Sequence, residues 1–181
     1  MKKTLFALLC IALGAFLWWA FSPLFIDTEV KDTLDPTLQA RLEAQRQVDA
    51  ARKQQPATSS DSTEESPTVH TEVTADGSLS RGPFPIKGTS GHPVSGTVDV
   101  VESPEERVLY FQDYDGTNGP DLHVYLSKDL EATDIIDLGT AKGNKGDIVY
   151  GMPLDVDLTE YPYVLTWCKA FNVLLKKKKI N

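Results

Sequence analysis

The chain has 181 residues, of which 41% are hydrophobic, and its formal net charge at pH 7 is -8. This length allows one domain with attached segments. The acidic balance argues against nucleic acid as a partner, because binding to phosphates requires clustered Lys and Arg. The basic cluster Lys176 to Lys179 lies beside the C-terminus, where we expect either a solvated tail or an electrostatic contact with an anionic surface.

Leu5 to Phe21 is an almost unbroken apolar run near the N-terminus. An apolar helix of about 20 residues spans the core of a bilayer. A cleaved signal peptide would have a shorter apolar region, of about 7–15 residues, before a site of small residues. Here large side chains occupy that place, and Trp18 and Trp19 suit a membrane interface. We therefore expect residues 1–26 to form a retained transmembrane anchor.

The charges on either side of the apolar run predict its orientation. Lys2 and Lys3 precede it, whereas Asp27, Glu29 and Asp32 dominate just after it. The positive-inside rule places the N-terminus in the cytoplasm and the rest of the chain outside. The expected protein is a single-pass membrane protein with an extracytoplasmic C-terminal domain, in the periplasm or at the cell surface.

Residues 27–83 are expected to connect this anchor to the domain. A helix is predicted from Asp35-Pro36 to Gln55, because Asp caps free amides and proline fits the first helical turn. Its apolar stripe is too narrow and too short for a dimerising coiled coil, so we expect a solvated stalk helix. The stripe consists of Leu34, Leu38 and Leu42, with Val48 beyond.

From Pro56 to about Gly82 the chain is rich in Ser, Thr, Glu and Pro and nearly lacks large apolar residues. Such a segment cannot bury enough surface to offset the entropy of ordering, so we expect it to be disordered. With a reach on the order of 25–30 Å, it would act as a flexible tether between membrane and domain.

Residues 84–181 show the pattern of a small all-β domain. Short segments rich in β-branched and alternating apolar residues are separated by Gly, Asp and Pro turns, with no convincing helix. This pattern predicts an antiparallel β-sandwich or barrel. The last strand is expected to be central in its sheet, because both its faces are largely apolar. The expected strands are 94–101, 108–111, 121–126, 135–138, 148–150 and 163–175.

Three motifs in the C-terminal half occur in a recognisable order. They are Gly119 to Ser127, Gly139 to Tyr150 and Tyr161 to Val173. Together they resemble the DM-thirteen domain family, a small β domain associated with electron transfer. The resemblance implies an all-β fold and a redox role.

Cys168 lies in the third motif and is the only cysteine outside the apolar N-terminal run. An unpaired cysteine is unusual in an exported domain. It is consistent with a small buried side chain whose thiol is inert, or with an intermolecular disulfide. The family resemblance implies a third interpretation, a redox-active or metal-ligating thiol.

A reactive thiolate requires nearby positive charge or a helix N-terminus. Lys169 follows Cys168 directly and would point to the opposite face of a strand, so activation has to come from elsewhere. The exported histidines His92 and His123 are therefore candidate cofactor-binding residues, although a lone histidine of this kind is more often simply solvated or hydrogen-bonded.

Other chemistry is not indicated. The acidic loop 113–121 lacks the glycine and glutamate positions of a calcium-binding EF-hand, so we expect turn chemistry and no metal site. Covalent haem, zinc, phosphate-loop and hydrolase motifs are absent from the sequence. An ordinary enzyme is therefore not expected, and no cofactor can be named.

The sequence leads to a membrane-anchored extracytoplasmic DM-thirteen-type domain with an electron-transfer role through Cys168. The alternative is a non-redox binding or adhesion module of the cell envelope that presents its loops to an extracytoplasmic protein or ligand.

Overall fold

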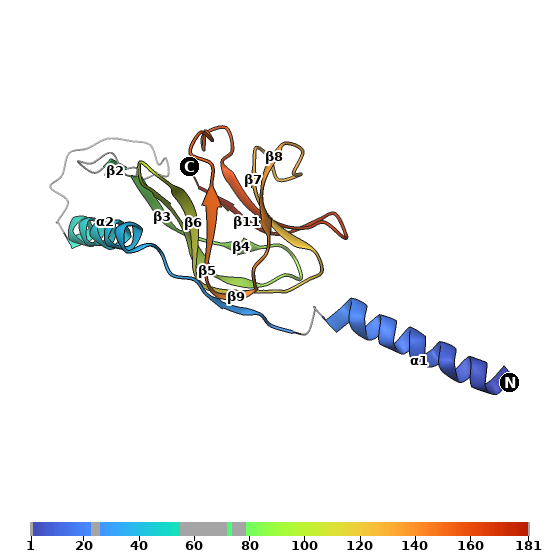
Figure 1. The fold of residues 1–181 in the computed structure, drawn as a ribbon. Coiled ribbons are helices and arrows are strands. Elements are labelled where there is room, and N and C mark those ends of the chain that lie inside the picture. Colours follow the sequence, from blue (N-terminus) through green and yellow to red (C-terminus); the bar gives the residue numbers. More distant parts are fainter. Residues whose placement is uncertain (1, 23–25, 55–71, 74–78, 181) are drawn as a thin grey trace.

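The structure is a computed structural model that describes residues 2–22, 26–54, 72–73 and 79–180. In this part of the chain two β-sheets face each other, and helix α1 (Lys2–Phe21) projects from one end of them (Figure 1). Helix α2 (Pro36–Gln54) lies beside one sheet. The fold is therefore mostly β and sandwich-like, as the turn and strand pattern predicts.

Both sheets are built largely from antiparallel neighbours; the exception among the described pairs is β1 with β9, which is parallel. In spatial order the first sheet consists of β1 (Glu29–Lys31), β9 (Lys145–Met152), β6 (Arg107–Gly116), β5 (Val94–Glu102), β3 (Leu79–Pro85) and β2 (Glu72–Val73). The second consists of β4 (Lys87–Gly88), β11 (Val173–Lys179), β10 (Tyr163–Cys168), β7 (Leu122–Ser127) and β8 (Ile135–Thr140).

The core lies between the sheets and is formed by alternate residues of their strands. Val98, Leu109 and Ile148 of the first sheet meet Leu126 and Val164 of the second, each with at most 3% of its surface exposed. Side chains on one strand face share this environment because they alternate with a period of two. Full burial of such a side chain contributes about 1.5–3 kcal/mol.

The predicted last strand, 163–175, is in fact two strands. β10 ends at Cys168 and β11 begins at Val173, and the two pair as an antiparallel hairpin. Asn172, in the turn between them, has φ 53°, a left-handed conformation that Asn tolerates better than most residues. The expected central position is confirmed for β10, which lies between β7 and β11.

The expectation that Lys176 to Lys179 form a solvated tail is wrong. These residues belong to β11. Lys176 pairs with Thr166 of β10 and is 1% exposed. The register of β11 against β10 shifts at Leu175, and this extra residue places Lys176 on the face of Thr166, toward the core, and not on the face of Leu174.

Helix α2 packs on the outer face of the first sheet instead of forming a solvated stalk. The stripe predicted for it is buried: Leu34, Leu38 and Leu42 are 7%, 2% and 4% exposed. They contact Val101 of β5 and Val108 of β6. A narrow stripe is too small for a coiled coil but is sufficient to cover one patch of a sheet.

Asn144 connects the segment before α2 to the sandwich. Its side-chain amide donates to Asp27 Oδ1 at 2.7 Å and to Gly116 O at 3.0 Å, and its Oδ1 accepts from the Thr28 amide at 2.6 Å. Nearby, Asp32 Oδ2 accepts from the Val149 amide at 3.1 Å. Residues 27–54 therefore pack as part of the domain.

The expected disordered linker, Pro56 to Gly82, falls largely outside the described residues, which omit 55–71 and 74–78. The part that is described differs from the prediction. β2 pairs with β3, and β3 already begins at Leu79 and pairs with β5. The folded domain thus starts before the predicted boundary at residue 84.

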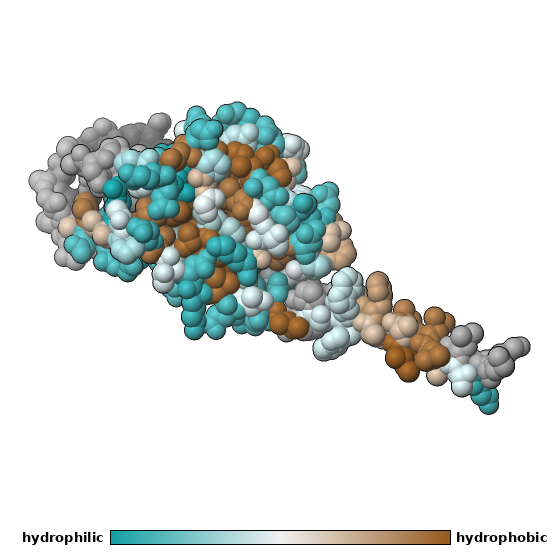
Figure 2. All heavy atoms as spheres, viewed as in Figure 1, coloured by the Kyte–Doolittle hydropathy of each residue, from teal (hydrophilic) through white to brown (hydrophobic). Residues whose placement is uncertain are grey.

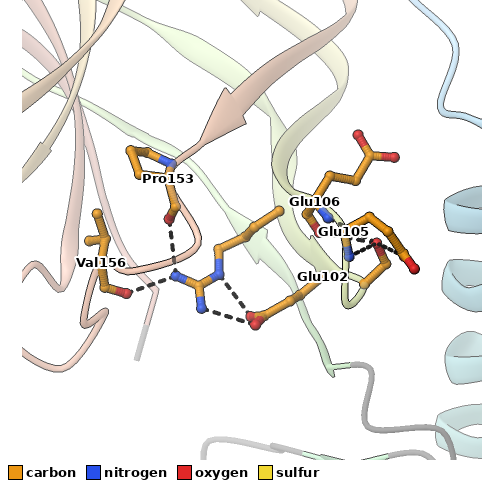
Figure 3. Close-up of polar contacts among 7 residues, drawn as sticks. Glu102, Glu105, Glu106, Pro153 and Val156 are labelled. Atoms are coloured by element: carbon orange, nitrogen blue, oxygen red, sulfur yellow. Dashed lines mark hydrogen bonds and ion pairs between the residues drawn. The ribbon is translucent and has the colours of Figure 1, made fainter.

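The end of the sandwich where β5 turns into β6 is closed by polar contacts (Figure 3). The Arg107 guanidinium binds both carboxylate oxygens of Glu102 at 2.8 and 3.0 Å, and it donates to Val156 O at 2.7 Å. Ser103 Oγ accepts from the backbone amide of Glu106 in the turn at 3.1 Å. Arg107 thereby joins the β5–β6 turn to the segment between β9 and β10.

Apolar side chains are exposed along α1 (Figure 2). Phe6, Ile11 and Trp19 of α1 are 68%, 68% and 73% exposed. Within the described residues, no helix combines the length and the apolar character needed to cross a membrane. The expected transmembrane anchor stays a prediction.

Candidate functional site

Cys168, the candidate redox residue, is buried at the end of β10. It is 3% exposed and packs with Leu122 of β7 and Leu175 of β11. Its thiol donates a hydrogen bond to the carbonyl oxygen of Pro120 at 3.1 Å. A thiolate has no proton to donate, so this contact belongs to the neutral thiol, which is not the nucleophilic form.

The loop that covers Cys168 joins β6 to β7 and comprises residues 117–121; we call it the cap loop. Lys176 Nζ donates to Thr117 O at 2.7 Å, and the Lys169 amide donates to Asp121 O at 3.0 Å. Asn118 Nδ2 donates to Ile26 O at 2.8 Å. The cap loop is therefore held by β11, by the β10–β11 turn and by the segment that follows α1.

His123 lies on β7 close to Cys168 in the sheet but on its other face. In the pairing of β7 with β10, His123 is opposite Trp167, whereas Leu122 is opposite Cys168. Directly opposed residues share a face and successive residues alternate, so the imidazole and the thiol point to different sides. The structure does not bring them together as joint ligands of one group.

The ring nitrogens of His123 each face a carboxylate. Nδ1 is 2.9 Å from Asp137 Oδ2 on β8, and Nε2 is 3.3 Å from Asp121 Oδ1 in the cap loop. The imidazole is 13% exposed. The Nδ1 contact is a hydrogen bond, whereas Nε2 lies at ion-pair distance from Asp121, so a ring that carries both protons is attracted to both carboxylates.

His92, the other candidate, lies in the turn between β4 and β5. Its backbone amide donates to Thr89 O at 3.0 Å, and its buried Nδ1 has no hydrogen-bond partner among the described residues. The adjacent Pro93 carbonyl accepts from the Thr117 hydroxyl at 3.3 Å. His92 is thus placed at the cap-loop end of the sandwich.

Lys176 is a buried cation near the cap loop that the sequence interpretation missed. Burial lowers the pKa of its amine to about 8. The amine lies 5.2 Å from the centroid of the Tyr114 ring, and burial raises the pKa of Tyr114. Alternation of faces gave no signal for this burial, because the register shift at Leu175 breaks the alternation just before Lys176.

Lys176, Tyr114 and Thr166 line a cavity between the sheets with a volume of about 10 Å³. That volume holds about one water molecule. A larger ligand would not fit in the cavity as it stands.

The acidic loop 113–121 shows turn chemistry. Asn118 Oδ1 accepts from the Gly119 amide at 2.9 Å, and Asp121 has φ 50°. In the described part of the chain, no group of three or more His, Cys, Asp or Glu side chains gathers as metal ligands would.

A family model described as Electron transfer DM13 matches residues 86–175. This range contains Cys168, His92, His123 and the cap loop. No curated protein matches the chain, and no solved structure does.

Proposed function

Because the match over residues 86–175 makes this chain a member of the DM13 family, we propose that it is a membrane-anchored extracytoplasmic domain that transfers electrons through the Cys168 thiol. The observation that carries the proposal is the family's association with electron transfer, together with a single thiol placed under a loop held by hydrogen bonds. In the exported domain Cys168 is the one side chain capable of thiol chemistry.

We propose the anchor from the apolar run 5–21 of the sequence. The structure does not describe every side chain of this run. The exposure of Trp18 and Trp19, at 72% and 73%, supports it, because side chains of this size are seldom left in water together. Lys2 and Lys3 before the run favour a cytoplasmic N-terminus. A reporter that is active only in the cytoplasm, fused to the C-terminus, is expected to stay silent; activity would contradict this orientation.

A single thiol cannot form an internal disulfide, so we propose exchange with a partner's disulfide. The Cys168 proton passes to solvent, and the thiolate attacks one sulfur of the partner's disulfide. A new sulfur–sulfur bond to Cys168 forms, the partner's bond breaks, and its second sulfur leaves as a thiolate. The Cys168 sulfur is thereby oxidised to the disulfide level and the leaving sulfur is reduced to a thiolate; a second thiol, from another protein or a small molecule, must then attack the mixed disulfide to complete the two-electron transfer.

The test uses the full chain with Cys10→Ser, so that Cys168 is the remaining thiol. The folded protein is incubated with a small aromatic disulfide, and the intact mass is measured. We expect one mixed disulfide per chain, and none in the Cys168→Ser variant. Reaction only after denaturation, with unimpaired cellular function of Cys168→Ser, would exclude the redox proposal.

The burial of the thiol and its bond to Pro120 favour a second candidate, the non-redox binding module. A groove of about 270 Å³ on the outer face of the second sheet is lined by Tyr125 and Trp167 beside Lys169. Tyr125 and Trp167 are largely buried, so the groove offers a contact surface around the exposed Lys169 that is independent of Cys168. Lys169→Ala would then impair function in cells, whereas Cys168→Ser would not.

A further inference from the structure

His123 holds together two elements that are separate in the chain. Asp137 belongs to β8, and its carboxylate also accepts from the Gly139 amide at 2.8 Å, so its position is set by its own strand. Asp121 belongs to the cap loop and is the more exposed partner, at 52% of its side chain against 37% for Asp137. His123 thus connects a fixed carboxylate with one on the loop.

The cap loop transmits this connection to Cys168 through the backbone. Asp121 follows Pro120, whose carbonyl accepts the thiol hydrogen bond, and the Asp121 carbonyl accepts from Lys169, the residue after Cys168. Asp121 has φ 50°, a conformation that costs energy for a residue with a side chain and persists only when contacts hold it. Release of the Asp121 side chain would free this short stretch to move.

We propose that His123 is a positioning residue for Cys168: as the imidazolium it bridges Asp137 and Asp121 and so keeps the cap loop closed over the thiol. This inference rests on the proposed thiol chemistry for its biological meaning, because a closed loop protects the thiol and an open one lets a partner reach it.

The charged and titratable groups around His123 determine whether the cap loop is held more firmly at low or at high pH. Asp121 of the cap loop and Asp137 of β8 face the ring directly. Tyr125 of β7 lies with its ring centroid 6.0 Å away. Lys169, in the β10–β11 turn, acts on Asp137. The pKa of Asp137 lies below its ordinary value, since hydrogen bonds from His123 and the Gly139 amide, with the charges of His123 and Lys169, outweigh the effect of its burial.

When the imidazolium loses a proton, one ring nitrogen becomes an acceptor facing a carboxylate oxygen, and that contact becomes repulsive. The Asp121 contact is the longer one, at 3.3 Å against 2.9 Å, and the Asp121 side chain can turn to water. Asp121 is therefore the partner that is released. The cap loop therefore opens when the imidazolium becomes neutral.

The test measures how fast a neutral maleimide alkylates Cys168 in the full chain with Cys10→Ser, from about pH 5.5 to about pH 8. Each rate is divided by the rate of the His123→Gln variant at the same pH, which cancels the ionisation of the thiol itself. At the acidic end we expect alkylation of the wild type to be about two- to fivefold slower than that of His123→Gln, and at the alkaline end we expect equal rates. This factor corresponds to the free energy of one partly exposed ion pair.

Two further variants separate the bridge from a merely structural role. Asp121→Asn removes one carboxylate and is expected to behave as His123→Gln does. His123→Arg keeps a planar cation that never titrates, so alkylation should stay slow at both ends of the pH range. As a matched control, Lys128→Gln breaks the ion pair of Lys128 with Asp134, 2.8 Å apart, beyond the opposite end of β7, and should leave the ratio unchanged.

A ratio that is the same at both pH values, or an equal effect of Lys128→Gln, would overturn the proposal. The proposal would also be overturned if Cys168 were alkylated only in the globally unfolded protein. In that case the alkylation rate would increase with urea concentration in proportion to the unfolded fraction. This result can be distinguished from that of the redox test. A pH-dependent ratio without mixed-disulfide formation would support the positioning role of His123 and reject electron transfer by Cys168. Mixed-disulfide formation with a pH-independent ratio would support electron transfer and reject the positioning role.

Discussion

At the scale of single residues, Lys176 is a cation whose burial in the core carries an electrostatic cost. Its amine is buried, with one backbone carbonyl and one aromatic ring as partners. Burial lowers its pKa from 10.5 to about 8. In the unfolded chain the amine binds its proton up to the higher value, so the unfolded state holds more protons between these two pKa values. The free energy of unfolding should therefore rise with pH in that window.

Lys176→Met tests this cost. We expect the rise in unfolding free energy between about pH 8 and pH 10.5, on the order of 3 kcal/mol in the wild type, to disappear in the variant. Urea denaturation at several pH values measures the difference between the two proteins, in which other titrating groups cancel. Lys179→Met, at an exposed position of the same strand, is the control. The same pH slope in wild type and Lys176→Met would contradict the expectation.

Asp99, under α2, titrates in the opposite sense. It is 1% exposed, and burial raises its pKa from 3.8 to about 6 against the opposing effects of Arg46 and Gln112. The folded state keeps the proton in this interval while the unfolded chain releases it. The corresponding stability is fully present below about pH 4 and is lost as the pH rises through 6.

Asp99→Asn should therefore raise the free energy of unfolding at neutral pH, by about 1–3 kcal/mol, and should have little effect below about pH 4. The amide can still accept from Gln112, which donates to Asp99 Oδ2 at 2.6 Å. Asp155→Asn, at an exposed position, serves as the control. Destabilisation at neutral pH would mean that the Arg46 ion pair outweighs the cost of burial.

The candidate residues show what the sequence could and could not predict at this scale. Cys168 was identified from the sequence, but its hydrogen bond to Pro120 depends on a loop distant in the chain. His123 and Asp121 are only two residues apart in the chain, so their contact could be expected from the sequence. The contact of His123 with Asp137 exists only because β7 and β8 pair. Lys176 was missed because four consecutive lysines resemble a solvated tail.

At the scale of elements, α2 is the clearest difference from the prediction. The sequence indicates its limits well, since Asp35 caps the helix by accepting from the Thr37 amide at 2.9 Å. It does not indicate what the leucine stripe contacts, because Val101 and Val108 lie on the first sheet and far along the chain. The stripe predicts that one face of the helix is apolar but does not predict which residues pack against it.

Leu38→Ala is the test of that packing. Leu38 is 2% exposed, so its truncation should lower the free energy of unfolding by about 2–4 kcal/mol, through lost burial and a cavity. Val48→Ala, on the same helix at a position 42% exposed, should have an effect below about 0.5 kcal/mol. Chemical denaturation of both variants gives the comparison. Similar effects would indicate that α2 does not pack on the sheet.

The strands were predicted better than their ends. The interval 94–101 corresponds to β5 and the interval 121–126 to β7, because turn residues flank both. The β10–β11 hairpin was not predicted, since its turn, 169–172, has no glycine or proline and apolar residues continue on either side. Asn172, in the left-handed conformation, was the remaining local signal.

For the whole molecule, the docking of β1 and α2 changes the expected arrangement at the membrane. The segment between α1 and the first docked residue, 22–26, can extend over about 20 Å at most. The cap loop is bonded to Ile26 at the end of this segment. If α1 lies in lipid, as proposed, the end of the sandwich with Cys168 and the cap loop stays close to the bilayer surface. The predicted long tether does not separate them, because residues 55–71 follow α2.

This arrangement predicts how the molecule responds to a cut in the chain. A protease site introduced within residues 56–71 and then cleaved would leave two fragments, one with α1, β1 and α2 and the other with the rest of both sheets. We expect them to remain associated in detergent, because α2 buries its leucine stripe on the first sheet, and Asn144 and Asp32 hold β1 and its neighbours. Size-exclusion chromatography after cleavage measures the association. Leu38→Ala combined with Asn144→Ala, which removes contacts from both docked elements, should separate the fragments. Separation of the fragments without these substitutions would indicate that α2 is a solvated stalk helix joined to the domain by a flexible tether.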